Sequence, residues 1–289
     1  MHPAPSIILF TTLSGLGFGM LAFLGLDAPA PRGWVAFWFF AIAFALSAGG
    51  LLSSTFHLGH PERALKAFTQ WRSSWLSREA WLAVLALGTM GLYAIGLVFF
   101  DTRWSPLGIL GGVLSLATVF ATSMIYTQMR TVPRWNHWSP PVLFLLYAVA
   151  GGGLLTGHVS LALWLFPLAG IMQIVAWADQ DRREKASDTT IATATGLGGL
   201  GTVRAFEPPH TGSNYLTKEM VFRIGRKHAS TLKIISLALA FALPVLLLLL
   251  PFHHIMAVLA VLSHIAGVLV QRWLFFAEAR HVVGLYYGR

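Results

Sequence analysis

The sequence predicts an all-α fold, a polytopic membrane bundle of eight transmembrane helices. Of the 289 residues, 56% are hydrophobic and only 11% are charged, whereas about a quarter of the residues in soluble domains carry a charge. The mean hydropathy is +0.67. Uncharged apolar runs recur along the whole chain, and a helix of about 20 such residues crosses a hydrocarbon layer roughly 30 Å thick. These observations exclude a soluble globular domain.

The predicted spans cover residues 6–26, 34–57, 79–100, 106–129, 141–157, 160–178, 230–250 and 255–276. The first span lacks a basic n-region and a cleavage site, so we interpret it as a helix that stays in the protein rather than a removable signal. The second ends at the polar residue His57, and the third opens with Ser77-Arg78-Glu79. The fourth stops before Pro133, because a proline disfavours helix in the residue that precedes it. The eight spans form a single integral membrane domain, 1–289.

The basic residues predict the orientation of the spans. Of the 20 Lys and Arg residues, all but Arg32 and Arg103 belong to the loops after spans two, four and six, the entry to span seven and the C-terminal end of the chain. By the positive-inside rule, both termini and the long polar loop at residues 179–229 are cytoplasmic. A loop of that length is unusual and is expected to be functional or bound by a partner.

Acidic residues lie only in loops or at span ends. The hydrocarbon centre therefore has no carboxylate, which disfavours a proton pump or a coupled transporter. A transporter stays open as an alternative because Gly151-Gly152-Gly153 lies inside the fifth span. The main ionisable exceptions are Arg272 and His264, both in the last span. We interpret Arg272 as a side chain that snorkels to the membrane surface.

The chain has no cysteine and 11 histidines. It therefore builds no disulfide, iron-sulfur cluster or thiolate zinc site of its own, and we assign no metal ligands. A haem b would need two histidines facing each other at one depth, but His264 has no second histidine at its depth. We do not expect haem b, although a haem-bearing cytochrome subunit stays open as an alternative.

The strongest functional signal follows the second span. Pro61 suits the first turn of a short amphipathic helix at the membrane interface, which holds His57, His60 and Arg63 near the lipid boundary. Glu79 emerges at the same membrane face. A quinone ring needs hydrogen-bond donors, groups that exchange protons and a charge that stabilises the reduced form, and these residue types supply them. A helix cap for His57 and a favourable helix-dipole position for Glu79 are the purely structural alternatives.

Two further segments on the cytoplasmic side carry polar chemistry. Tyr126, near the end of the fourth span, is a polar group at membrane depth that either joins the quinone site or hydrogen-bonds within the bundle. The sequence Gly196-Leu197-Gly198-Gly199-Leu200-Gly201 matches a dinucleotide-binding pattern, but no strand precedes it, so we interpret it as a loop. The candidate residues for partner docking are Arg130, Arg134, His210, Tyr215 and Lys218.

These motifs resemble a known family. His57-Leu58-Gly59-x-Pro61-x-Arg63-Ala64, Leu76-Ser77-x-Glu79, and Tyr126 followed by Thr131-Val132-Pro133-x-Trp135 are similar to the membrane-anchor subunit of the dimethyl sulfoxide reductase type. That group includes the polysulfide and nitrite reductase anchors. Residues 206–220 and 275–281 resemble the branch of quinone-linked sulfite dehydrogenase anchors. His60 departs from the serine that the family pattern has at this place, and this puts the proton route in doubt.

The resemblance implies a complex in the bacterial inner membrane. Its partners are a molybdopterin catalytic subunit and a ferredoxin-like subunit with [4Fe-4S] clusters, both on the cytoplasmic side. The family's histidine at the position of His57 is implicated in quinone binding, and the matching Arg63 and Glu79 are associated with that site. Members of this type lack haem in the anchor. Nucleic acid is not an expected partner.

We therefore expect a non-catalytic subunit of a quinone-dependent molybdoenzyme, with no catalytic residues of its own. Its role is to pass electrons from the iron-sulfur subunit to ubiquinone during sulfite oxidation. The main alternative reverses the flow, with quinol oxidation driving reduction of dimethyl sulfoxide or a related substrate. The anchor does not touch the substrate, so its sequence does not choose between them.

Overall fold

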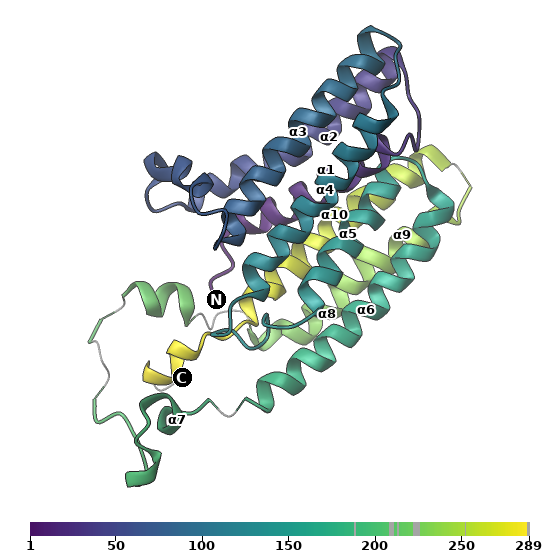
Figure 1. The fold of residues 1–289 in the computed structure, drawn as a ribbon. Helices are drawn as coiled ribbons and strands as arrows, with labels where there is room; N and C mark the ends of the chain where they lie inside the picture. The colour runs from purple at the N-terminus through teal and green to yellow at the C-terminus, as the bar shows by residue number, and fades with distance from the viewer. Residues whose placement is uncertain (188, 208–210, 213, 222–225, 252, 288–289) are drawn as a thin grey trace.

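The computed structural model describes residues 1–289 except 188, 208–210, 213, 222–225, 252 and 288–289, and the side chains of His57, Arg226 and His253 also lie outside the description. The described residues form helices and no strands (Figure 1). Seven of these helical segments are long and apolar enough to cross a membrane, and one apolar helix is shorter. The all-α prediction of a multi-pass bundle is confirmed.

The membrane helices are α1 Pro5–Gly25, α2 Gly33–Ser53, α3 Trp75–Phe99, α4 Ser105–Thr127, α5 Ser139–Leu155, α6 Val159–Lys185, the continuous α8 Ala229–Leu237, η6 Ala238–Ala242 and α9 Leu243–Leu248, and α10 His253–Ala277. The short elements are η1 Ser54–His57, η2 Pro61–Phe68, α7 Ile191–Thr195, η3 Gly198–Leu200, η4 Leu216–Met220, η5 Arg226–His228 and η7 Val282–Tyr287. Each predicted span corresponds to one of the membrane helices.

The largest difference from the predicted bounds is at α6, which continues to Lys185 instead of ending at residue 178. The prediction stopped at the first charged residue. In the structure, Arg182 and Arg183 both bind the Asp179 carboxylate, at 2.6 and 3.1 Å. Such pairs three and four residues apart stabilise a solvated helical turn, so the first residues of the predicted polar loop belong to α6.

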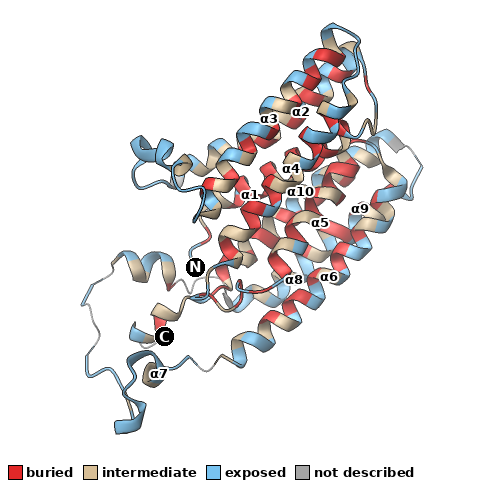
Figure 2. Ribbon diagram, viewed as in Figure 1, coloured by how far each residue is buried: buried red, intermediate tan, exposed pale blue. Residues whose placement is uncertain are grey.

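The bundle consists of two groups of helices. One group is α1 to α4, and the other is α5, α6, the α8–α9 segment and α10, with α1 packed against α4, α5 and α10 (Figure 1). Within its most apolar stretch, α1 is 78% buried, against 28% for α2. Figure 2 shows the buried residues along these inner contacts and exposed residues on the outer faces. The helix α1 is therefore the centre of the bundle.

Glycine lets α1 and α5 touch through their backbones. A Cβ atom at Gly152 of α5 would lie 2.3 Å from the carbonyl carbon of Gly19 on α1. Small residues of this kind permit close helix contact in a membrane, where packing rather than the hydrophobic effect drives association. The three consecutive glycines of the fifth span therefore do not break the helix, since α5 runs through them to Leu155.

One end of the bundle carries the N-terminus, α7, η4, the described residues between α6 and α8, and η7 near the C-terminus (Figure 1). Backbone hydrogen bonds connect these parts. The His2 amide donates to the Glu219 carbonyl at 2.6 Å, and the Val282 amide donates to the Thr131 carbonyl at 3.0 Å. This end of the molecule, called the loop end below, is the end at which η1, η2 and the first turn of α3 also lie.

Candidate functional site

The centre of the candidate site is Glu79, in the second turn of α3. Its side chain faces α4 rather than solvent and is only 4% exposed. The Thr122 hydroxyl of α4 donates to the Glu79 carboxylate. The start of α3 is fixed by the Gln70 amide, which donates to the Ser77 hydroxyl at 3.1 Å. A carboxyl group is thus held inside the bundle at the loop end.

The partner of Glu79 suits both of its protonation states. Thr122 also lies 3.0 Å from the Thr118 carbonyl. A hydroxyl has one proton, so Thr122 donates either to ionised Glu79 or to that carbonyl, and in the second arrangement its oxygen accepts from protonated Glu79. The pair therefore stays hydrogen-bonded while Glu79 gains or loses a proton.

Tyr126 follows Thr122 by one helical turn on α4 and is 5% exposed. Its ring is surrounded by aromatic side chains, with ring-centroid distances of 5.3 to 5.9 Å to Trp135, Phe144, Phe275 and Phe276. Thr122 contacts the Glu79 carboxylate, so Tyr126 lies one helical turn along α4 from that contact. Phe275 and Phe276 of α10 pack against the Tyr126 ring.

The other predicted quinone residues lie on the surface segment before α3. His57 ends η1, but its side chain lies outside the described residues. The His60 side chain is 65% exposed and pairs with Glu62 at 2.9 Å, and Arg63 approaches the same carboxylate at 3.9 Å. The structure thus gathers His60 and Arg63 around Glu62, apart from the buried Glu79. Their roles in quinone binding stay predictions.

The surface segment is nevertheless attached to the helix that carries Glu79. The Trp81 indole nitrogen donates to the Phe68 carbonyl at 3.0 Å. The Phe68 and Trp81 rings also pack edge to face, with centroids 5.3 Å apart. The element η2 therefore lies against the outer face of α3, while Glu79 lies on the inner face of the same helix.

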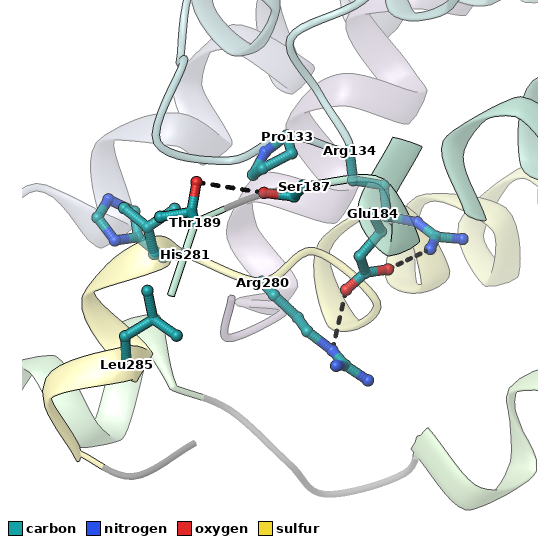
Figure 3. Close-up of a pocket in the computed structure, with 9 residues that line it drawn as sticks. Pro133, Arg134, Glu184, Ser187, Thr189, Arg280, His281 and Leu285 are labelled. Carbon is teal, nitrogen blue, oxygen red and sulfur yellow. Dashed lines mark hydrogen bonds and ion pairs between the residues drawn. The ribbon is translucent and has the colours of Figure 1, made fainter. Parts of the chain in front are cut away.

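Arg134, a predicted docking residue, is the centre of an internal ion-pair network. Its side chain is 6% exposed, and its two terminal nitrogens lie 2.7, 2.9 and 3.3 Å from oxygens of Asp181, Glu184 and Glu278. Arg280 binds the second Glu184 oxygen at 3.0 Å. Figure 3 shows Glu184 between Arg134 and Arg280, all three of which line a cavity of about 170 Å³. The Arg134 guanidinium is paired with carboxylates of its own chain. A partner subunit would therefore meet the whole ion-pair network and not a free arginine, and docking at Arg134 stays a prediction.

The remaining docking candidates are Arg130, Tyr215, Lys218 and His210. Arg130 and Lys218 are exposed, and Tyr215 is 61% exposed. The negative charge of Glu219 raises the pKa of Tyr215 above its usual range. His210 lies outside the described residues. The first three face solvent at the loop end, where a partner has access to them, and docking itself stays a prediction.

Two features near the site were not predicted from the sequence. The first is Thr122, which lies four residues before Tyr126. This spacing places both side chains on one face of α4, so Thr122 could have been identified as a site residue from the sequence. The second is the burial of Arg272, and the interpretation that Arg272 snorkels is wrong. Arg272 is 2% exposed, and its guanidinium lies 3.6 Å from the centroid of the Phe144 ring. Its burial depends on the packing of α5 against α10, for which the sequence carries no signal.

Comparison with known proteins gives two matches. The family model for the DMSO reductase anchor subunit (DmsC) matches residues 1–288. A sulfite dehydrogenase subunit from Allochromatium vinosum is 32% identical over 323 aligned positions, which cover 99% of both chains. No solved structure matches. The matches agree with the resemblance of the His57, Glu79 and Tyr126 motifs, and the chain belongs to the DMSO reductase anchor subunit family.

Proposed function

We propose that this chain, as the anchor of a molybdoenzyme complex, passes electrons from a cytoplasmic iron-sulfur subunit to ubiquinone in the inner membrane, with sulfite oxidised by the catalytic subunit. The sulfite assignment is supported by the relative that is named as part of a sulfite dehydrogenase. The cytoplasmic side is supported by the basic residues of the loop end.

The observation that carries the quinone role is the buried Glu79 with its hydroxyl partner Thr122 at the loop end. Quinone reduction takes up two electrons and two protons, so its site needs a group that delivers protons without exposing the ring to bulk water. Glu79 delivers one proton, and Thr122 then donates to the carboxylate that remains. Tyr126 offers a further hydroxyl in an apolar aromatic setting. His57, His60 and Arg63 belong to the surface segment before α3, and we propose that they contact the quinone ring from that side.

The reverse direction has one specific observation in its favour, which is the reductase named by the family model. In that case Glu79 accepts a proton from quinol, and the same Thr122 contact satisfies the protonated acid. The residues of the anchor serve both directions, and the catalytic partner sets which one operates.

Replacing Glu79 by glutamine in the purified complex tests the site. The amide keeps the shape and the hydrogen bond but moves no proton, so quinone turnover should fall by at least a factor of about 100, the lower range for lost general acid catalysis. Reduction of an artificial dye by the catalytic subunit should remain. Asp101→Asn, an acid-to-amide change at the opposite end of the bundle, is the control and should retain quinone turnover.

His57→Ala in the same assay tests the surface half of the site and should abolish quinone turnover while dye reduction survives. Wild-type quinone turnover in both variants would show that the site lies elsewhere in the bundle. A wild-type complex that reduces dye with sulfite but transfers no electrons to or from any quinone would overturn the proposed function itself.

A further inference from the structure

A pocket lies on the outer face of α3, whereas Glu79 lies on the inner face of this helix. It has a volume of about 430 Å³, is lined by Phe68, Trp71, Trp75, Arg78, Trp81 and Leu82, and is called the tryptophan pocket below. This volume lies within the roughly 300–1,000 Å³ of ordinary small-molecule sites. The pocket is formed where the segment after η2 returns to the first turns of a membrane helix, at the level of the membrane interface.

The walls of the tryptophan pocket are held in place by hydrogen bonds. Arg78 donates from Nε to the Trp71 carbonyl at 3.0 Å and from Nη2 to the Arg72 carbonyl at 2.7 Å. The Trp81 bond to the Phe68 carbonyl fixes the opposite wall. Trp75 also packs edge to face on Phe120 of α4, with centroids 5.8 Å apart. The pocket is therefore preformed and does not require a ligand to assemble it.

The pocket presents apolar surface at membrane depth. Trp71 is 56% exposed and Trp81 is 46% exposed. Tryptophan is enriched at membrane interfaces because its ring is apolar while its N–H group remains near the polar headgroups. Tryptophans that only anchor a helix at the membrane interface do not need to form a cavity. These rings surround a cavity of about 430 Å³, a volume that accommodates part of a hydrocarbon chain.

The pocket carries positive charge, because Arg78 belongs to its lining and Arg72 stacks on the lining residue Trp71. Arg78 lies 4.4 Å from the centroid of the Trp75 ring, and Arg72 lies 5.4 Å from that of Trp71. Arg78 uses two of its five N–H donors on the Trp71 and Arg72 carbonyls, so its remaining donors, with those of Arg72, are available to a phosphate.

The carboxylate nearest to these arginines in sequence, Glu79, lies on the inner face of α3 and accepts from Thr122. The next, Glu62, binds His60 and Arg63. Within the described part of the chain, the ion pairs include neither Arg72 nor Arg78.

We propose that the tryptophan pocket binds an anionic phospholipid, with one acyl chain against the indole rings and its phosphate on Arg72 and Arg78. Basic pockets beside membrane helices on the cytoplasmic side are known to take anionic headgroups. A neutral isoprenoid would use the apolar wall but would leave both cations without a counter-ion. The bound lipid would brace η2 against α3, the helix that holds Glu79.

The test measures lipid retained by the full-length chain, purified in detergent and delipidated, in native mass spectrometry. Phosphatidylglycerol and phosphatidylcholine with identical acyl chains are added separately. We expect the wild-type chain to retain phosphatidylglycerol preferentially. Arg72→Gln should reduce that preference about fivefold, in line with the attraction of one basic residue near an anionic surface. Lys66→Gln, which removes an exposed charge from η2 but leaves the guanidinium stacked on Trp71, is the matched control and should retain the preference.

Arg72 donates no bond from its side chain to the pocket backbone, so its replacement leaves the walls intact. Trp71→Leu is the second variant and should weaken retention of both lipids, because it removes part of the apolar wall. Equal retention of both lipids by the wild type, or an unchanged preference in Arg72→Gln, would overturn the proposal. So would a short-chain ubiquinone that displaces phosphatidylglycerol and binds Arg72→Gln as well as wild type, since that outcome assigns the pocket to quinone.

Discussion

Buried ionisable side chains have different surroundings inside the bundle. Glu79 has a hydroxyl partner that adapts to its protonation state. Arg272 lies on an aromatic ring, and its Nε has no hydrogen-bond partner among the described residues. Arg134, at the loop end, is surrounded by three carboxylates. The first arrangement suits proton exchange, whereas the last is structural because its charges are already balanced within the chain.

Replacing Arg134 by methionine should destabilise the protein, because three carboxylates then lose their common cation. Breaking a fully buried pair costs about 3–5 kcal/mol. Asp181 is 46% exposed and the other two acids less, so screening by water reduces the expected loss to about 2–3 kcal/mol. Thermal unfolding in detergent measures the change. Arg182→Gln, at a side chain 79% exposed, should shift the midpoint little, and equal shifts in the two variants would contradict the structural role.

Among the helices, a proline explains the irregular segment between α8 and α9. Pro244 lacks an N–H, so the Ala240 carbonyl four residues earlier has no helical donor. The chain widens into the π-helical turn η6 at this place. His264 of α10 approaches the freed Ala240 carbonyl with Nδ1 at 2.7 Å, and the Ser263 hydroxyl donates to the Leu239 carbonyl at 2.7 Å. These bonds attach α10 to the seventh span.

This attachment requires a glycine on α10. A Cβ atom at Gly267 would lie 2.1 Å from the Ala240 backbone nitrogen, so Gly267→Ala should force the two helices apart and destabilise the fold by about 1–3 kcal/mol, the usual cost of overpacking. Gly88→Ala places a Cβ in open space on α3 and should be neutral or slightly stabilising, because alanine favours helix. Thermal midpoints of the two variants decide the matter, and a Gly267→Ala protein as stable as Gly88→Ala would refute the close contact.

Across the whole molecule, most ion pairs of the described residues lie at the loop end. There they attach the segments between helices to the ends of α6 and α10. His137, between α4 and α5, contacts Asp179 of α6 at 3.0 Å and is 8% exposed. Burial, together with repulsion by Arg183 and Arg182, outweighs the attraction of Asp179 and lowers the pKa of His137. The neutral imidazole is therefore the form that the folded protein favours.

A lowered pKa in the folded state predicts a loss of stability in acid. The contribution of His137 is fully present above the unfolded-state pKa of about 6.5 and is lost as the pH falls through the lower folded-state value. The thermal midpoint of the wild type should therefore be lower at a pH of about 5.5 than at about 7.5, on either side of that unfolded-state pKa. In His137→Gln, which has no titratable ring, the fall should be smaller. A steeper fall in the variant than in the wild type would reverse the sign of this linkage.

The spans were predictable because membrane crossing is a local property. The length of an apolar run decides whether it can cross the membrane, and this length is read directly from neighbouring residues. Each predicted run corresponds to a helix in the structure. The error at Asp179 arose because a charge was taken as the end of a helix, whereas ion pairs along one helix face extend α6 into the aqueous region. Of the candidate site, the sequence named Glu79 and Tyr126, whose roles stay predictions, whereas the hydroxyl partner Thr122 was available from helical spacing.

The number of membrane helices, the side on which the basic residues gather, and the motifs shared with the anchor family all follow from the amino-acid sequence alone. Which ionisable groups are buried was settled only by the packing of the helices. Arg272 and Arg134 are both arginines near span ends, yet one faces Phe144 and the other three carboxylates. The difference arises because burial depends on which helix faces meet, and those contacts join residues far apart in the chain.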